Sequence, residues 1–369
     1  MANPSYRWCF FDPGQMDYHP DSPEQIPLGG SQAALAYLCR ELVKQGQAVT
    51  LVNQTRGPGE YAGVKCLNQS ALSPEFWQKS NFDLVVSLNH FQELIQLPGS
   101  FKRVFWNQHN PQVKGIEKLA EAMSRIDQLV YVSQWQRDAY ASEWGIHAKT
   151  SVCRNACPPF YQALHVDPIE FVQARPGPLT LAYTSTPFRG LKLLIAIFPG
   201  LRQLFPDLRL KVFSSLKVYQ ENPQIESEYE SLYQECQALA GVEYHGSIPQ
   251  SQLYQELKHC HILAYPNIYS ETSCIAVMEA MAAGCHVITT ELAALPETCA
   301  GFATLVPDPL YQRELGLLFF EALCQLIARF YQDPLAMAEH SLQQSQFALT
   351  HYAWSKRAQE WIQLAGRLV

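Results

Sequence analysis

Two glutamates eight positions apart frame a short segment whose residue types suit the binding of a phosphorylated, hydroxyl-bearing ligand. Glu271 precedes the predicted helix 273–283, and Glu279 lies about two turns inside it. The first amides of a helix lack partners within the helix and carry the positive end of its dipole, so they can hold a phosphate. Eight residues at about 1.5 Å each place the two carboxylates roughly 12 Å apart. The two carboxylates could then accept hydrogen bonds from hydroxyl groups that lie on opposite sides of one diphosphate.

A simpler interpretation needs no ligand. Glu271 would then complement the helix dipole from the first turn, and Glu279 would be an exposed helix residue. Against this, Glu279 is followed by the apolar run Ala280 to Ala283, and Gly284 ends the predicted helix. A carboxylate on an apolar helix costs free energy unless it has a partner. The context therefore favours a binding role for both glutamates.

A cation lies in a second loop, directly after another predicted strand. Arg189 follows the run Thr184 to Phe188, and Lys192 is three residues further on. A guanidinium can bind phosphate oxygens through two N–H groups at once. The alternative is a solvated arginine at a helix start. The chain has no Asp-x-Asp motif, and a cation with a helix N-terminus can supply the electrostatic stabilisation, so we expect no metal ion.

The segment that carries the two glutamates resembles retaining glycosyltransferase family four, whose fold is GT-B. The resemblance rests on the E-x7-E arrangement that ends in E-A-M-A-A-G, followed by a predicted strand and Leu295-Pro296-Glu297. It is strong over roughly 180–310. It is weaker but collinear from Gly29 to Asn155 and at the C-terminus.

The resemblance assigns roles to residues of the second half. It implies that Glu271 contacts hydroxyls of the donor sugar and that Glu279 contacts the ribose. Arg189 stands where the family often has a lysine that neutralises the diphosphate, and Thr184 stands where it often has an arginine. The remaining implied contacts are the backbone amides of Ser273, Cys274, Ile275 and Ala276 for the sugar and distal phosphate, and Glu297 at the nucleotide pocket. Thr272, Ser273 and Cys274 replace the family's usual glycines, which narrows the room for the sugar.

The resemblance also assigns roles in the first half. The pair Gly29-Gly30 matches glycines that let backbone approach the reacting sugar, and His109 matches a histidine near the transferred sugar. Asn155 matches the first residue of an interdomain Asn-Gly, although Ala156 follows it here. Simpler interpretations exist for all three features. The glycine pair could form a turn, His109 could be a surface histidine, and Asn155 could be a linker residue.

Strand-like runs alternate with helical patterns along most of the chain, which is typical of parallel α/β architecture. The pattern predicts a first strand Tyr6 to Phe11, a helix with Ser31 as its N-cap, and a helix capped by Ser133. Pro158 to Pro178 is rich in proline and predicts a linker, and Pro199 predicts a kink in helix 190–205. Helices dominate after about residue 311.

The fold class expected is α/β, GT-B, with two facing Rossmann-like domains and a cleft between them. Residues 1–160 would form the acceptor-side domain and 175–349 the nucleotide-sugar domain. Helix 350–369, with Tyr352, Trp354 and Trp361, would pack back on the first domain. Ligands in such folds bind at the carboxyl ends of the strands.

Composition excludes several classes of protein. The 369 residues carry a net charge of −7, with 27 Lys and Arg against 34 Asp and Glu, which argues against a nucleic-acid partner. The N-terminus lacks the apolar core of a signal peptide, and no apolar run of about 18 residues could span a bilayer. The eleven cysteines are interpreted as reduced residues of a cytoplasmic protein. Peripheral membrane contact stays open.

The expected reaction moves a hexosyl group from a nucleoside diphosphate sugar to an acceptor hydroxyl with retention of configuration, without a further cofactor. Arg189 and the helix N-terminus would stabilise the leaving diphosphate, while Glu271 and His109 orient the sugar. The acceptor could be a glycan, a lipid-linked molecule or a small molecule. The alternatives are a sugar-nucleotide epimerase, or a non-catalytic binding protein with this fold. A dinucleotide-dependent dehydrogenase is disfavoured because no G-x-G-x-x-G follows the first strand.

Overall fold

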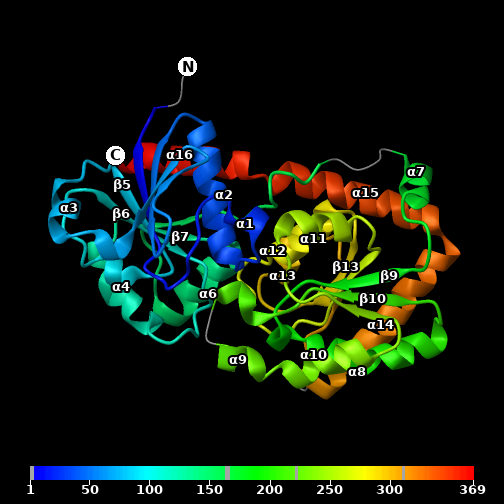
Figure 1. Cartoon of the computed structure of the whole chain (residues 1–369). Helices are drawn as coiled ribbons and strands as arrows, with labels where there is room; N and C mark the ends of the chain where they lie inside the picture. The colour runs from blue at the N-terminus through cyan, green and yellow to red at the C-terminus, as the bar shows by residue number, and fades with distance from the viewer. Residues whose placement is uncertain (1–3, 163–166, 221–222, 310–311) are drawn as a thin grey trace. The chain divides into compact units, whose positions relative to one another are not determined.

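The chain folds into two compact units, Met1–Ala156 with Ala353–Val369, and Cys157–Tyr352. The computed structural model describes residues 4–162, 167–220, 223–309 and 312–369 (Figure 1). Each unit contains one sheet with helices packed against it.

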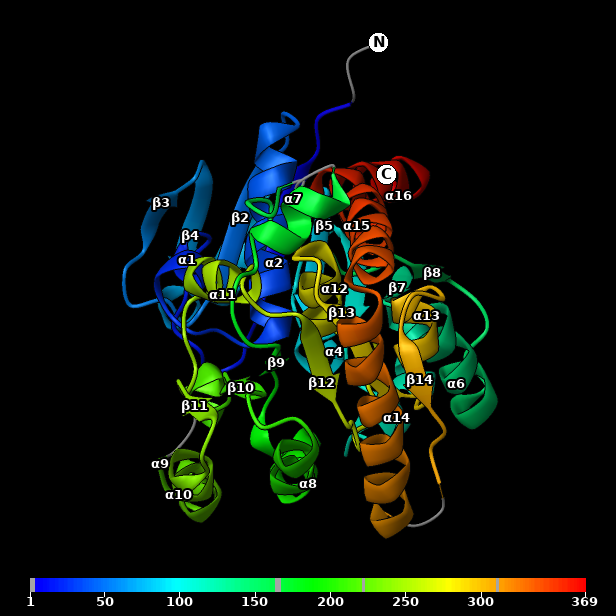
Figure 2. The ribbon, with the colours of Figure 1, turned by 90° about the vertical axis from the view of Figure 1, so that its right-hand side faces the viewer.

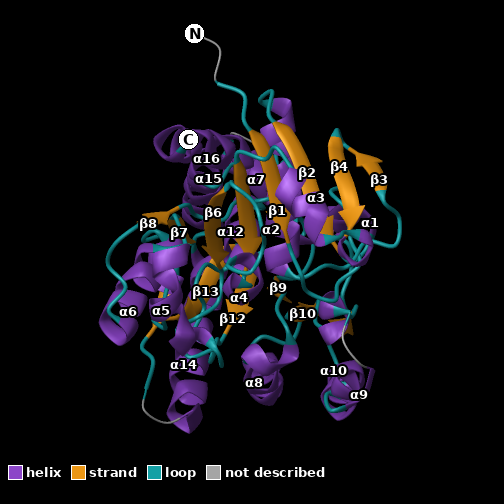
Figure 3. Cartoon of the chain, turned by 90° about the vertical axis from the view of Figure 1, so that its left-hand side faces the viewer, coloured by secondary structure: helices purple, strands orange, loops and turns teal. Residues whose placement is uncertain are grey.

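The first unit contains an eight-stranded sheet of order β3-β4-β2-β1-β5-β6-β7-β8, in which only the β3–β4 pair is antiparallel among the described pairs. Figure 3 shows β3 and β4 at one edge of this sheet. Its helices include α2 and the C-terminal α16. The strands are β1 (Arg7–Phe11), β2 (Ala48–Asn53), β3 (Gly59–Tyr61), β4 (Val64–Asn68), β5 (Leu84–Leu88), β6 (Lys102–Asn107), β7 (Gln128–Tyr131) and β8 (Thr150–Val152). The helices are α1 (Ser22–Gln25), α2 (Gly30–Lys44), α3 (Pro74–Lys79), α4 (Phe91–Leu94), α5 (Leu119–Ala122), α6 (Gln134–Trp144) and α16 (Trp354–Leu368).

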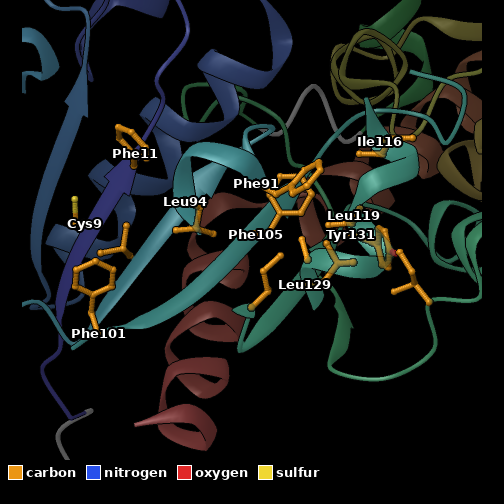
Figure 4. Packing of buried hydrophobic residues seen from close by; sticks show 14 of the residues in the cluster. Cys9, Phe11, Phe91, Leu94, Phe101, Phe105, Ile116, Leu119, Leu129 and Tyr131 are labelled. Carbon is orange, nitrogen blue, oxygen red and sulfur yellow. The ribbon is translucent and has the colours of Figure 1, made fainter. Parts of the chain in front are cut away.

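Aromatic side chains fill both sides of the first sheet. On one side, Phe11, Phe91 and Phe105 belong to a buried cluster, and the rings of Phe91 and Phe105 meet edge to face at 5.6 Å (Figure 4). On the other side, Trp361 of α16 lies 5.2 Å from Trp106, ring to ring. The last helix therefore completes the core of the first unit, because a parallel sheet must be covered on both faces.

The second unit contains a fully parallel six-stranded sheet in its described part, of order β11-β10-β9-β12-β13-β14. Figure 2 shows α14 and α15 as two long successive helices of this unit. The strands are β9 (Thr180–Tyr183), β10 (Arg209–Val212), β11 (Val242–Tyr244), β12 (Ile262–Tyr265), β13 (His286–Thr290) and β14 (Thr304–Val306). The helices are α7 (Pro168–Gln173), α8 (Leu191–Leu204), α9 (Pro223–Ser227), α10 (Glu230–Ala238), α11 (Gln250–Leu257), α12 (Ile275–Ala282), α13 (Leu295–Cys299), α14 (Gln312–Gln332) and α15 (Pro334–His351).

Among the described parallel strands, each sheet has one point where the direction of strand succession reverses. In the first sheet this point lies between β1 and β5, and in the second it lies between β9 and β12. The loops that leave the carboxyl ends of these strands diverge to opposite faces, which creates the usual binding crevice of open α/β sheets. Both switch points are therefore candidate ligand sites.

The structure corrects several local expectations. The N-cap of α2 is Gly29 rather than Ser31, whereas Ser133 caps α6 as predicted, its side chain accepting from the amide of Gln136. Within the expected linker 158–178, the described residues 167–178 include α7 instead. Phe171 of that helix is buried, and Arg175 lies 3.7 Å above its ring. Residues 163–166 of that segment lie outside the described residues.

Candidate active site

A glycine brings two loops into contact at the switch point of the second sheet. The first loop follows β9 and contains the 3₁₀ turn Pro187–Arg189, and the second follows β12. Gly190 has φ of +122°, and a Cβ atom at this position would lie 2.0 Å from the carbonyl oxygen of Pro266. No other residue type fits this conformation and this approach. The glycine therefore allows the Arg189 loop to lie directly against the β12 loop.

Arg189 and Glu271 form an ion pair at this switch point. Nη1 of Arg189 donates to Oε1 of Glu271 at 2.7 Å, and the Tyr265 hydroxyl donates to the same oxygen at 2.6 Å. The side chains are 21% and 7% exposed, respectively. Burial is the largest single influence and acts to lower the pKa of Arg189, but the Glu271 carboxylate and the three surrounding tyrosine hydroxyls together raise it well above its ordinary value, so the guanidinium stays charged. The sequence predicted both residues as site residues but did not predict their pairing.

Two further tyrosines surround the same guanidinium. The Tyr219 hydroxyl accepts from Nη2 of Arg189 at 3.3 Å. The ring of Tyr269 faces the guanidinium carbon at 4.4 Å from the ring centroid, which is cation–π geometry. Neither tyrosine belongs to a motif, so nothing in the sequence singled them out.

The N-terminus of α12 lies next in the chain after Glu271. The helix begins at Ile275, two residues later than predicted, so Ser273 and Cys274 belong to the preceding loop. Cys274 is the N-cap residue, with extended backbone and no side-chain hydrogen bond to the helix. The first amides of α12 are therefore left without a side-chain cap, which leaves them available to an anion.

Several buried polar atoms in these loops have no hydrogen-bond partner within the described part of the chain. They are the hydroxyl oxygens of Thr184, Thr186 and Ser273, and Nε of Arg189. Native proteins rarely leave such atoms unpaired, and a ligand is one common reason. Thr184 stands where the resembled family often has an arginine, and it thus contributes an unpaired hydroxyl to this site instead of a cation.

Glu279 is buried inside the second unit, so the interpretation of it as an exposed helix residue is wrong. Its side chain is 3% exposed, and Oε1 accepts from the side-chain amide of Gln250 at 2.9 Å. Burial raises the pKa of Glu279 to about 8. The carboxyl group is therefore largely protonated at neutral pH and can donate as well as accept a hydrogen bond. Sequence reasoning missed Gln250, which lies in no recognisable motif.

Two other predicted residues of the second unit differ in their surroundings. Glu297 lies in the first turn of α13, and the amide of Ala294, just before that helix, donates to the carbonyl oxygen of Glu271 at 3.0 Å. Lys192 is exposed on α8, and no described hydrogen bond or ion pair joins it to Arg189 or Glu271. A backbone hydrogen bond thus joins the residue before α13 to Glu271, whereas Lys192 takes no described part in the ion pair.

His109 lies at the carboxyl end of β6 in the first unit. Its amide donates to the Asn107 side chain at 3.0 Å, and its carbonyl oxygen accepts from Gln136 at 2.7 Å and from Tyr140 at 3.2 Å. Burial, with a smaller contribution from His90, lowers the pKa of His109 to about 4. The imidazole is therefore neutral at physiological pH and can either donate or accept a hydrogen bond.

The switch point of the first sheet also contains a buried carboxylate that the sequence did not single out. Asp12 directly follows β1 and accepts from the Gly14 amide at 3.2 Å, the Tyr18 hydroxyl at 2.7 Å and the Gln32 side chain at 3.2 Å. Gln32 stands in the first turn of α2, which begins at the predicted Gly29-Gly30 pair. The position of Asp12 after the first strand was the available signal.

Asn155 is buried at the end of the first unit. Its side-chain amide donates to the Gln108 side chain at 3.0 Å, one residue from His109. This contact ties the segment that leaves β8 to the loop that carries the histidine.

The described residues contain no group of three or more His, Cys, Asp or Glu side chains arranged to hold a metal ion. All eleven cysteines are free thiols, and ten of them are buried. Among the described helices, none combines the length and apolar character needed to cross a membrane.

Comparisons with known proteins agree with this architecture. Residues 183–309, which lie within the second unit, match the family model described as Glycosyl transferases group 1. This match includes Arg189, Glu271 and Glu279. No curated protein matches the sequence.

Solved structures similar to the chain span nearly all of it. Anabaena HepE in complex with UDP-glucose has a TM-score of 0.70 at 15% identity, covering 98% of this chain and 100% of the other. Sucrose-phosphate synthase from Thermosynechococcus elongatus has a TM-score of 0.69 at 16% identity, covering 98% and 99%. WaaG, a glycosyltransferase involved in lipopolysaccharide biosynthesis, has a TM-score of 0.66 at 15% identity, covering 97% and 99%. The expected α/β fold of the GT-B class is thereby confirmed.

Proposed function

We propose that the protein is a retaining glycosyltransferase that moves a hexosyl group from a nucleoside diphosphate sugar to an acceptor hydroxyl. The observation that carries this proposal is the Arg189–Glu271 ion pair beside the uncapped N-terminus of α12, at the switch point of the second sheet. The match of residues 183–309 to a glycosyltransferase family model supports it.

Departure of the nucleoside diphosphate is the step that needs most electrostatic help. Negative charge grows on the phosphate oxygens as the bond to the sugar breaks. Arg189 and the first amides of α12 can stabilise that charge, and fixed donors are effective because they need little reorganisation. The unpaired hydroxyls of Thr184, Thr186 and Ser273 are further donors for the same oxygens. A metal ion is not required by this arrangement.

Recognition of the donor would involve both glutamates. Glu271 keeps a second carboxylate oxygen beyond the one that binds Arg189 and Tyr265, and that oxygen can accept a hydrogen bond from a sugar hydroxyl. Glu279, largely protonated and held by Gln250, would bind the ribose. We further propose that His109 and the Gly29-Gly30 turn act on the sugar from the first unit.

A thermal-shift screen with UDP, GDP, ADP and their glucose conjugates tests donor binding, because a ligand that binds the folded state raises the melting temperature. We expect one base to stabilise the protein selectively. A labelled donor is then incubated with and without sugar acceptors, and the products are separated. Transfer to an acceptor with retention supports the proposal, whereas donor isomerisation without an acceptor indicates an epimerase. Binding without turnover across all acceptors would instead identify a non-catalytic binding protein.

A further inference from the structure

We propose that Tyr219 and Tyr269 are positioning residues that hold the Arg189 guanidinium in the orientation needed to bind the donor diphosphate. This inference rests on the proposed function. Glu271 binds Nη1 of Arg189, Tyr219 binds Nη2, and the Tyr269 ring faces the guanidinium carbon at 4.4 Å. The ring of Phe188 lies further away, at 5.4 Å. Nε is left without a partner in the described structure.

Tyr269 is fixed by the loop that also fixes Glu271. The Asn267 side chain donates to the carbonyl oxygen of Tyr269 at 2.6 Å and accepts from its amide at 3.1 Å. The carbonyl oxygen of Tyr269 also accepts from the amide of Glu271 at 2.8 Å. Asn267 is fully buried, and its own carbonyl oxygen accepts from the Thr290 hydroxyl at 2.9 Å. One anchored turn thus sets both the ring above Arg189 and the carboxylate beside it.

Tyr219 is fixed from a different part of the unit. It ends a 3₁₀ turn, Leu216–Tyr219, whose N-cap is Ser215. The Ser215 hydroxyl and the Leu216 amide both donate to the carboxylate of Glu226 on α9, at 2.8 and 2.7 Å. This carboxylate holds the start of the turn and thereby the position of the Tyr219 hydroxyl at its end.

Orientation matters more here than at a site with two cations. Thr184 supplies no charge at the position where the resembled family often has an arginine, so Arg189 is the cation that this loop offers to the diphosphate. A free arginine loses conformational freedom when it binds, and a side chain fixed beforehand loses less. The two tyrosines fix Arg189 without adding a negative charge that would compete with the phosphates. Their combined effect is a guanidinium ready to bind through its remaining N–H groups.

Calorimetric titration of Tyr219→Phe, Tyr269→Leu and Tyr269→Phe tests this inference. The probe is whichever of UDP, GDP and ADP binds the wild-type protein. We expect Tyr269→Leu to weaken binding about threefold to tenfold and Tyr219→Phe about twofold to fivefold. Tyr269→Phe keeps the ring and should stay within about twofold of wild type. Tyr331→Phe, at an exposed tyrosine of α14, is the matched control.

A double-mutant cycle separates positioning from a structural role. If the tyrosines act through Arg189, then adding Tyr269→Leu or Tyr219→Phe to Arg189→Ala should weaken binding no further. An unchanged affinity in the single variants, or an equal loss in the Arg189→Ala background, would overturn the inference while leaving the proposed function intact. If the wild-type protein binds none of the three nucleotides, the proposed function itself fails. Tyr219→Phe removes one oxygen, so the test remains decisive even if Tyr269→Leu does not fold.

Discussion

Arg189 and Glu271, which lie 82 positions apart in the sequence, meet at 2.7 Å in the second unit. The residue expected to bind sugar hydroxyls and the residue expected to bind the diphosphate therefore share one ion pair. A pair that is mostly buried has a fixed geometry, and the loss of one member leaves the other charge uncompensated. Loss of the Arg189 charge should consequently weaken nucleotide binding, whereas loss of the Glu271 charge should not.

Glu271→Gln should lower kcat for sugar transfer by about a hundredfold or more, because the sugar loses an orienting carboxylate. The same variant should bind a nucleoside diphosphate at least as tightly as wild type, because Arg189 is no longer neutralised. Steady-state kinetics and calorimetry measure the two effects. Glu235→Gln, at an exposed glutamate of α10, is the control. Normal transfer by Glu271→Gln would refute the site assignment.

Arg189→Ala should weaken nucleoside diphosphate binding about tenfold to a hundredfold, since charge-assisted hydrogen bonds are lost. The matched control is Arg209→Ala, which removes an exposed arginine at the amino end of β10. Calorimetry on both variants gives the comparison. Equal affinities for wild type and Arg189→Ala would show that this guanidinium does not contact the phosphates.

Gly190→Ala should destabilise the second unit by at least about 3 kcal/mol, because it combines a left-handed backbone with a clash against Pro266. Gly177 has φ of +101° but open space around its Cβ position. Gly177→Ala should therefore cost only about 1 kcal/mol, which isolates the backbone contribution. Denaturant unfolding measures both. A similar loss in the two variants would mean that the β12 loop can move away from residue 190.

Acid should destabilise the protein through buried histidines of the second unit. Burial, with smaller contributions from His340 and Arg329, lowers the pKa of His286 to about 3, and burial with Arg175 lowers that of His261 to about 4. Both values are below the ordinary 6.5, so the unfolded chain binds more protons between these limits. Their stabilisation is complete above about pH 6.5 and decreases as the pH falls toward 3.

Chemical unfolding at pH 7 and pH 5 measures this loss, which should be on the order of 2 kcal/mol for each histidine and about 4 kcal/mol for the two together. His286 contacts Thr304 through Nε2 at 3.1 Å and the His340 ring at 4.7 Å. His286→Gln should make stability depend less steeply on pH in this range than in wild type. A variant with an unchanged slope would exclude His286 as a source of the acid sensitivity.

Glu279→Gln should stabilise the protein at alkaline pH. The pKa of Glu279 in the folded state, about 8, lies above its ordinary value of 4.5, so its contribution to stability is complete below about pH 4.5. That contribution is lost as the pH rises through 8, because a buried carboxylate must then ionise. The glutamine variant avoids this cost and should be about 2 kcal/mol more stable than wild type at pH 9. Equal stability of the two proteins at pH 9 would contradict a buried, protonated Glu279.

The sequence predicted the alternation of strands and helices well, since buried parallel strands such as β5 and β12 are short apolar runs. It missed β3 and β4 at the edge of the first sheet. Gly59–Tyr61 is exposed or half-buried, so it lacks the apolar signal of an interior strand. It also placed the N-cap of α2 at Ser31, although the N-cap is Gly29 and the helix begins at Gly30. Caps are set by local backbone angles that composition only weakly constrains.

The site was predictable where one residue type has one plausible chemical use. The apolar neighbours of Glu279 indicated that its carboxylate needs a partner, and Gln250 is that partner. The loop position of Arg189 singled out a cation, which pairs with Glu271, while its contact with a phosphate stays a prediction. Their partners were not predictable, because Gln250, Tyr219 and Tyr269 reach the site through the packing of separate loops. A tyrosine in a sequence also suits a core or a surface, so its type alone indicates no role.

The long sequence separation between Trp361 and the strands it covers has a consequence for synthesis. Trp361 lies within 6.3 Å, ring to ring, of Trp8, Phe10 and Trp106. Before it reaches α16 and Trp361, the ribosome translates residues 157–352, which form the second unit. While the ribosome makes them, three large aromatic rings of the nascent first sheet lack their final packing partner. A chain arrested before residue 354 should therefore expose an apolar, tryptophan-rich face of the first sheet, to which chaperones are expected to bind.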